Sequence, residues 1–328
     1  MSDLPAALSA KTTADLLAAW QCAQHWVREL HASDAAAAVG WQKALAQHLY
    51  GAWYAGSTIG HAPTAPDAAC DTARELPLVN RLRAAHAATS RYSGGWTVRA
   101  IGRRGAATLT RGRERLHRMP PDYVNFARPG VPAGLNDVVA VVTRRDEVEV
   151  ETGWWFTDGR GGAEALRHMV RVYWNCPAAL APDLVGAITR VTETSAVPYS
   201  LKCPRLAEGF ERVDPFVLYL GRDDWSALRH SLRDVHARYG SALRVDIPRL
   251  ALSLGRGAAL AEDPSNGLSF GESRAGAVAA GALLALTTGI VDDASVLDIL
   301  LRQLRAHGID PTRPHLRVGT PDRLVPPW

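Results

Sequence analysis

Hydrophobic residues recur at helical spacing in the first part of the chain. One stretch marks a single helix face, and a second leads into "YGAWYAG" with the same spacing; the positions are Leu16, Trp20, Ala23, Val27 and Leu30, then Leu45, Leu49 and Trp53. The loop "IGHAPTAPDAACD" then interrupts the periodicity with glycine and prolines. We therefore expect a helical N-terminal region over residues 1–62, followed by a second domain over residues 75–328.

The second region combines strand and helix patterns. From Gly95 to Gly159 the segments "GWTVRAI", "DVVAVVT" and "VEVETGWWF" are typical of strands separated by turns. After them, "MVRVYWN" and "DPFVLYLG" predict strands that alternate with amphipathic helices, and residues 274–308 predict two further helices. The pattern favours an α+β fold, in which a mixed or antiparallel sheet is flanked by helices.

Two of the predicted strands carry polar side chains on one face. Because side chains alternate along a strand, Arg171 and Tyr173 share the face opposite three apolar residues. In "VPYSLKC" the same rule places Ser200 and Lys202 together on a polar face. On spacing alone, a solvated strand edge or an ion pair with a carboxylate explains Lys202 more readily than catalysis does.

Lysine is rare in this chain. Of the 37 basic residues only Lys11, Lys43 and Lys202 are lysines, so 34 are arginines. A lysine in an apolar stretch then suggests a task that needs an amine, because a guanidinium group keeps its proton in proteins.

Composition narrows the class of protein. The 328 residues are 47% hydrophobic, enough for a core, and no apolar run is long enough for a membrane span. No signal peptide is visible and the four cysteines lack C-x-x-C spacing, so we expect a cytoplasmic protein with reduced thiols. A net charge of +4 with dispersed arginines suits an anionic substrate, and neither nucleic acid nor membrane is the expected partner.

A glycine-rich loop offers an alternative site. Gly267, Ser269 and Gly271 have the G-x-S-x-G spacing of a hydrolase nucleophile, and Asp298 and His307 follow in a possible order. That motif requires a preceding strand, and "AEDPSN" is a poor one, so a chance match is the better interpretation. The histidines lack metal-ligand spacing, and neither a P-loop nor a dinucleotide fingerprint occurs, so no metal or cofactor is expected.

Four segments together resemble a known family. In order they are "RVYWN", "VPYSLKC", "ERVDPFVLYL" and "LALSLGRGAALAEDPSNGLSFGESRAG". They are similar to the HopA1 family, named for a type III effector and also found as a stand-alone lyase in gene clusters for class V lanthipeptides and thioamitides. The similarity is best over residues 168–286 and implies a fold like that of the phosphothreonine lyases.

The resemblance implies a reaction. Such lyases remove phosphate by β-elimination from phosphoserine or phosphothreonine and leave dehydroalanine or dehydrobutyrine in a precursor peptide. It also implies a partner, since a kinase of the aminoglycoside-phosphotransferase type supplies the phosphorylated precursor peptide, often in a complex with the lyase.

Five residues match functional positions of the family. Lys202 matches the general base, and Arg171, Arg212 and Arg274 match the positions that contact phosphate. The nearby cations are expected to lower the pKa of the amine. Tyr173 stands where the phosphothreonine lyases have a histidine as general acid, and a phenol is a weaker acid at neutral pH.

Other functions remain open at this point. A non-catalytic module that binds a peptide or a partner would use the cationic strand faces for docking only. A serine hydrolase would use Ser269. A virulence effector is a further alternative, although the N-terminus lacks a disordered, secretion-type composition.

Overall fold

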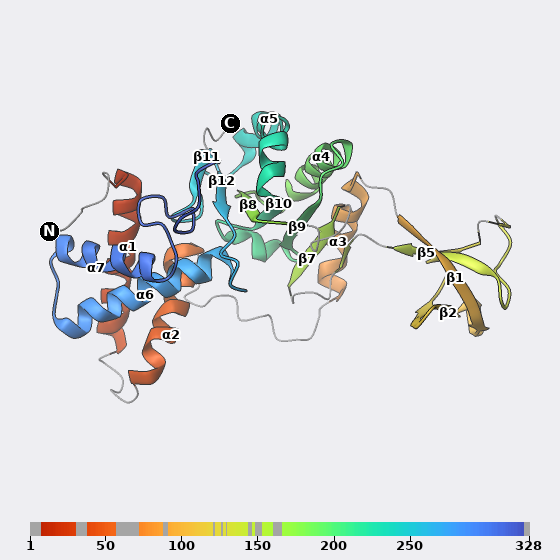
Figure 1. Cartoon of the computed structure of the whole chain (residues 1–328), viewed down its shortest axis with the longest axis horizontal. Helices are drawn as coiled ribbons and strands as arrows, with labels where there is room; N and C mark the ends of the chain where they lie inside the picture. Colours follow the sequence, from red (N-terminus) through yellow and green to blue (C-terminus); the bar gives the residue numbers. More distant parts are fainter. Residues whose placement is uncertain are drawn as a thin grey trace. The chain divides into compact units, whose positions relative to one another are not determined.

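The protein, seen here as a computed structural model (Figure 1), divides into two compact units, Met1–Ala87 with Val148–Trp328 and Ala88–Glu147. The structure describes residues 8–30, 38–56, 72–87, 91–120, 122–125, 127–128, 130–143, 146–147, 153–159 and 166–324. The predicted boundary between residues 62 and 75 falls largely outside these ranges. The N-terminal helices belong to the same compact unit as residues 148–328.

An antiparallel sheet forms the centre of the larger unit. Its order is β11-β12-β8-β10-β9-β7-β6. The strands of this unit are β7 (Trp154–Asp158), β8 (Met169–Trp174), β9 (Tyr199–Pro204), β10 (Phe216–Gly221), β11 (Leu252–Gly255) and β12 (Ala258–Glu262), while the two-residue strand β6 (Asp146–Glu147) falls within the residue range of the smaller unit. The predicted strands "MVRVYWN", "VPYSLKC" and "DPFVLYLG" are thus confirmed as β8, β9 and β10, and they lie side by side.

Three helices cover one face of this sheet. They are α3 (Thr72–Ala85), α4 (Ala181–Thr194) and α5 (Arg222–Tyr239), and they bury a core with the apolar face of β8, β9 and β10. Helix α5 forms because Trp225, Leu228 and Leu232 recur on one side and are buried. It begins directly after Gly221, and Gly240 follows its last residue.

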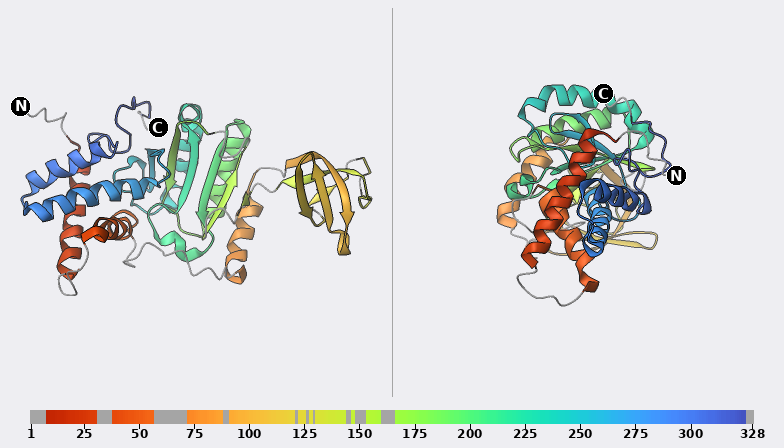
Figure 2. Two further views of the ribbon diagram at one scale, coloured as in Figure 1. Left: turned by 60° about the horizontal axis from the view of Figure 1, so that its bottom comes forward. Right: turned by 90° about the vertical axis from the view of Figure 1, so that its left-hand side faces the viewer.

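A second group of helices packs on the opposite face (Figures 1 and 2). It comprises α1 (Ala10–Leu30), α2 (Ala38–His48), the π-helix η1 (Leu49–Tyr54), α6 (Phe270–Thr288) and α7 (Asp293–Ala306). The predicted stripes of α1 and α2 are confirmed, since Leu16, Trp20 and Leu45 are buried in this second core. Among the described helices, none has the length and apolarity needed to cross a membrane.

The smaller unit is an antiparallel sheet with its own core. Its strand order is β3-β2-β1-β5-β4. The bounds are β1 (Arg91–Ile101), η2 (Arg103–Gly105), β2 (Ala107–Arg111), β3 (Glu114–Arg118), β4 (Tyr123–Val124) and β5 (Val138–Thr143). Trp96, Val98 and Leu109 are among the few residues that fill this core. The strands predicted between Gly95 and Gly159 therefore belong to two different sheets.

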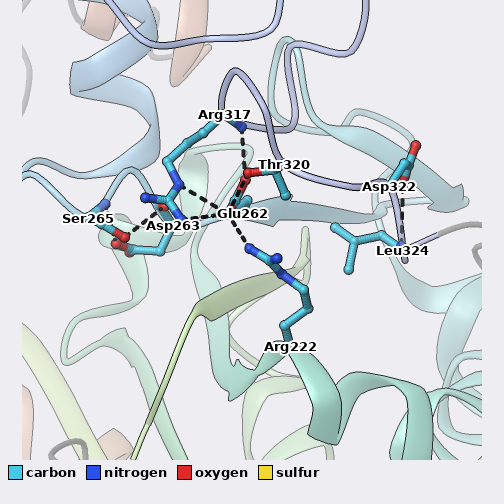
Figure 3. A network of polar contacts seen from close by, with 8 residues as sticks. All are labelled: Arg222, Glu262, Asp263, Ser265, Arg317, Thr320, Asp322 and Leu324. Carbon is cyan, nitrogen blue, oxygen red and sulfur yellow. Dashed lines mark hydrogen bonds and ion pairs between the residues drawn. The ribbon is translucent and has the colours of Figure 1, made fainter.

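A buried carboxylate holds the C-terminal segment against the rest of the larger unit. Glu262, at the end of β12, is 1% exposed and accepts hydrogen bonds from Arg222, Arg317 and Thr320 (Figure 3). Arg317 donates both from its guanidinium group and from its backbone N–H, the latter at 2.8 Å. Because α5 and the C-terminal segment both bond to this carboxylate, Glu262 fixes the end of β12. Asp263 follows it directly in the chain.

Candidate functional site

The polar strand faces predicted from the sequence lie on one surface of the sheet. Val217 of β10 is opposite Tyr173 on one side and opposite Lys202 on the other. Tyr219 is opposite Arg171 in the same way. With neighbouring strands about 4.8 Å apart, the backbones of residues 173 and 202 lie roughly 10 Å apart, and both side chains leave the sheet on the same face.

A cavity of about 530 Å³ lies over this surface. Strands β7 to β10 form its floor, α2 and η1 form one wall, and the first turn of α6 forms another. Four of the five predicted site residues line it, namely Arg171, Tyr173, Lys202 and Arg212. Its charged lining comprises these three cations and Lys43 against Asp214 and Glu272, so the lining carries a net positive charge.

Arg171 is held in place by a buried ion pair. Its Nε donates to Asp263 at 2.7 Å and its Nη2 to the carbonyl of Leu268 at 3.3 Å. Burial alone would lower the pKa of Arg171, but the oxygens of Tyr173, Tyr219 and Asp263 outweigh it and raise that pKa. The residue is therefore a permanent cation with a fixed direction.

Arg212 follows the short helix η4 (Ala207–Glu211) and enters the cavity from the side. Its guanidinium group pairs with Asp214, and its Nη2 donates to the hydroxyl of Tyr50 at 2.7 Å. Burial works to lower the pKa of Arg212, but Asp214 and Tyr50 raise it well above the ordinary value. The third nitrogen, Nη1, has no hydrogen bond to any described residue.

Lys202 lies next to Arg212 across one aromatic ring. The Lys202 Nζ is 4.3 Å from the ring centroid of Trp154, and the guanidinium carbon of Arg212 is 5.1 Å from the same centroid. Phe156, directly opposite Lys202 in the sheet, lies 5.6 Å from the amine. An amine and a guanidinium group thus share a half-buried, aromatic-lined part of the cavity.

Tyr173 is buried at the bottom of the site. Its side chain is 2% exposed, and its hydroxyl has no hydrogen-bond partner among the described residues. Burial raises the pKa of Tyr173, and the opposing effect of Arg171 does not cancel the rise. Tyr173 is therefore a still weaker proton donor than the sequence suggested, although it can donate a hydrogen bond and keep its proton.

Arg274 does not line the cavity. It is fully buried in α6, and its Nε and Nη2 donate to the carbonyl of Pro314 at 3.1 and 2.9 Å. Its guanidinium carbon lies 3.9 Å from the ring centroid of Phe270, which is itself a wall residue. Burial lowers the pKa of Arg274 to about 10, so it remains charged at neutral pH. Of the three arginines expected to contact phosphate, two therefore line the cavity, and the third, Arg274, lies behind its wall.

Ser269 has a structural role. Its side chain accepts a hydrogen bond from the backbone N–H of Glu272, and Glu272 accepts one from the N–H of Ser269. This reciprocal pair is a capping box, which starts α6 at Phe270. His307 bonds to the carbonyl of Gln303 and Asp298 pairs with Arg302, so these contacts do not form a catalytic triad with Ser269.

The start of α6 comes close to two tyrosines. A Cβ added at Gly271 would lie 2.3 Å from Cε1 of Tyr54 and 2.7 Å from Cε2 of Tyr50. Glycine is therefore required for the helix N-terminus to reach the cavity. Free N–H groups at such a terminus favour an anion.

Sequence reasoning missed the wall formed by α2 and η1. Lys43, Gln47, Tyr50 and Tyr54 all line the cavity. Their spacing of three to four residues is that of a single helix face, so the signal was present. Lys43 was also one of only three lysines, and two of the three now line the same cavity.

The chain is similar to a known protein family and to solved structures of low sequence identity. The model of the HopA1 effector protein family matches residues 146–316. The effector protein from Pseudomonas syringae pv. tomato strain DC3000 is 16% identical, with 92% of this chain and 98% of that chain covered and a TM-score of 0.46. The effector protein from Pseudomonas syringae pv. syringae strain 61 is 15% identical, with 94% and 98% covered and a TM-score of 0.48. No curated protein sequence matches the chain.

Proposed function

Since the chain belongs to the HopA1 effector protein family, we propose that its cavity eliminates phosphate from phosphoserine or phosphothreonine in a peptide. The observation that carries the proposal is the meeting of Arg171, Arg212 and Lys202 in one cavity. These three residues lie in separate segments of the matched region. Two fixed guanidinium groups can bind a phosphate, and an amine next to them can remove a neighbouring proton.

Phosphate binding falls to the two arginines. Asp263 and Asp214 hold them by Nε and Nη2, and in both Nη1 has no hydrogen bond to a described residue. Charge-assisted hydrogen bonds from guanidinium groups are the strong ones for phosphate oxygens. Because the aspartates fix both groups before substrate arrives, little ordering remains to be done on binding.

Proton removal falls to Lys202. Its neutral amine takes the α-proton of the phosphorylated residue, and the electrons of that C–H bond form the Cα=Cβ double bond. The Cβ–O bond breaks, its electron pair leaves with the phosphate, and Lys202 becomes an ammonium ion. Tyr173 can hydrogen-bond to the departing oxygen, and the positive lining stabilises the growing negative charge.

The substrate proposal follows the family resemblance. A precursor peptide is first phosphorylated by a separate kinase of the aminoglycoside-phosphotransferase type, in a complex with this protein. The product then carries dehydroalanine or dehydrobutyrine, as in class V lanthipeptide biosynthesis.

Mass spectrometry of phosphoserine and phosphothreonine peptides incubated with the protein tests the proposal. We expect a loss of phosphoric acid, no change in the unphosphorylated peptides, and full activity with excess EDTA. A thiol added afterwards should label the product, because dehydro residues accept thiols. Return of the plain serine peptide would indicate a phosphatase, and binding without any mass change would indicate a non-catalytic module. Either result would contradict the lyase.

Lys202→Arg tests the base directly. The variant keeps the charge but cannot present a neutral amine, so it should bind phosphopeptide normally and lose at least about a hundredfold in elimination rate. Lys11→Arg is the matched control, since Lys11 pairs with Asp15 at 2.7 Å and does not line the cavity. Near-normal turnover by Lys202→Arg would remove Lys202 from the mechanism.

A further inference from the structure

Positive charge is concentrated in the smaller unit. Residues 88–147 contain 11 arginines and 5 acidic residues, a net charge of +6. The remaining 268 residues contain 26 basic and 28 acidic residues, a net charge of −2. The modest charge of the whole chain is therefore the sum of a small, strongly basic unit and a larger, slightly acidic one. The family match at residues 146–316 barely overlaps the basic unit.

Most of these charges are not neutralised within the unit. Arg111 pairs with Glu114 and Arg128 pairs with Asp137. Six other arginines of the described part have no carboxylate partner, and we call them the arginine cluster: Arg99, Arg103, Arg104, Arg113, Arg115 and Arg118. All but Arg118 are exposed. Like charges left unpaired on a unit with so small a core oppose its folding, so a compensating ligand would stabilise it.

The register of the strands places Arg99 and Arg115 on one face of a three-stranded segment and Arg118, opposite the buried Ala107, on the other. Thr110 of β2 is opposite Arg115 of β3, and Arg99 of β1 donates to the Thr110 hydroxyl at 3.1 Å. Arg118 is opposite Ala107, next to the turn that holds Arg103 and Arg104. The cluster thus follows β3, which is an edge strand of the sheet.

These features favour a peptide over a nucleic acid. Single-stranded nucleic acids bind through stacking on exposed aromatic rings, but Trp96 and Tyr123, the tryptophan and tyrosine of this unit whose side chains the structure describes, are both buried. An edge strand adds a peptide strand through its backbone, and the side chains beside it select the peptide. Arginines along such an edge repel basic strands and attract acidic ones. We propose that the edge of β3 and the arginine cluster bind an extended, acidic peptide segment.

This proposal rests on the charges of the smaller unit and does not depend on the elimination reaction. The test uses the full-length protein and a dye-labelled, unphosphorylated peptide of alternating glutamate and valine, measured by fluorescence anisotropy. We expect binding that weakens at least about tenfold between about 50 and about 500 mM salt, because exposed charges are screened. The same peptide with glutamine in place of glutamate should not bind.

Charge-reversal variants locate the site. Arg99→Glu combined with Arg115→Glu should weaken binding at least about tenfold, and so should Arg103→Glu combined with Arg113→Glu. The second pair lies in turns and leaves the strand contacts intact. It therefore still tests the proposal if the first pair, which lies in strands, unfolds the unit. Arg233→Glu combined with Arg305→Glu, on helices of the larger unit, makes the same change in net charge and should leave binding intact.

Three results would overturn the proposal. The first is the absence of salt-dependent peptide binding. The second is an equal loss in the control pair of variants, which would indicate attraction to the chain's net charge. The third is tighter binding of an oligonucleotide or an anionic vesicle of matched charge. Elimination of phosphate by the cluster variants on a short neutral phosphopeptide should stay normal, which separates this site from the cavity.

Discussion

Arg212 and Arg274 are both buried cations, but only Arg212 reaches the cavity. We expect Arg212→Ala to lose on the order of 2–4 kcal/mol of transition-state stabilisation, as for other preorganised donors. The measurement is kcat/KM on a phosphopeptide. Tyr50→Phe serves as the control, because it removes one hydrogen bond to Arg212 and keeps the cation; a loss as large as that of Arg212→Ala would contradict a role in phosphate binding.

Arg274→Ala should act on stability instead. It leaves the carbonyl of Pro314 without its two donors, which costs about 1–3 kcal/mol of unfolding free energy. Urea denaturation measures this loss, and kcat/KM of the folded fraction should fall less than in Arg212→Ala. A larger effect on turnover than on unfolding would show that Arg274 contacts the substrate.

Residue positions in strands were predicted better than those at helix starts. The alternation of "MVRVYWN" and "VPYSLKC" fixes which side chains share a face, so Arg171 and Lys202 could be placed from the sequence. Arg274 could not, because its direction depends on where α6 begins. Ser269 and Glu272 form a capping box that was readable as S-x-x-E, but the glycine spacing drew attention to a hydrolase motif instead.

At the scale of elements, the Glu262 carboxylate links β12 to α5 and to the C-terminal segment. Glu262→Gln leaves the half-buried Arg222 and Arg317 without their carboxylate, so we expect a loss of about 1–3 kcal/mol in unfolding free energy. Chemical denaturation measures it. Arg302→Ala breaks an exposed i,i+4 pair and should cost less than about 0.5 kcal/mol. Equal losses in the two variants would contradict the proposal that Glu262 links these three elements.

The C-terminal segment should also make stability depend on pH. His315 is 7% exposed, and burial lowers its pKa to about 4; Asp322 and Asp310 oppose this shift, while Arg313 and Arg274 add to it. A lowered pKa means that protonation favours the unfolded chain. Stability is therefore full above about pH 6.5 and falls as the pH drops towards 4.

His315→Gln should remove part of this fall, since glutamine does not titrate. Unfolding free energies at several pH values between 4 and 7 measure the difference, which is at most about 3 kcal/mol. His307→Gln, at an exposed position, should keep the wild-type dependence. An unchanged slope in His315→Gln would contradict the assignment.

At the scale of the molecule, the N-terminal helices supply one wall of the cavity. Lys43 is exposed on α2 and lines that wall, so it can attract the phosphorylated segment without touching the reacting atoms. Lys43→Ala should therefore raise KM several-fold and leave kcat nearly unchanged. Steady-state kinetics on a phosphopeptide decide this, with Lys43→Arg as the charge-preserving control. A large fall in kcat would place Lys43 in the chemistry.

The large-scale organisation was only partly predictable. Local periodicity gave the α+β class, the antiparallel strands and the helices that flank them, because each is encoded within a short window. The separation of residues 88–147 could not be read in this way. Its strands have the same kind of hydrophobic pattern as β7. Only the pairing with strands far away in the sequence assigns β5 to one sheet and β7 to another.

The cavity walls come from residues 43–54, 154–219 and 268–276, and Glu262 is held by residues as late as 320. Synthesis proceeds from the N-terminus, so most of the sheet leaves the ribosome before the wall of α6 and before its C-terminal fastening. A nascent or prematurely terminated chain thus has no finished cavity. The proposed site is therefore complete only after residues 262–320 have been made and have folded against the sheet.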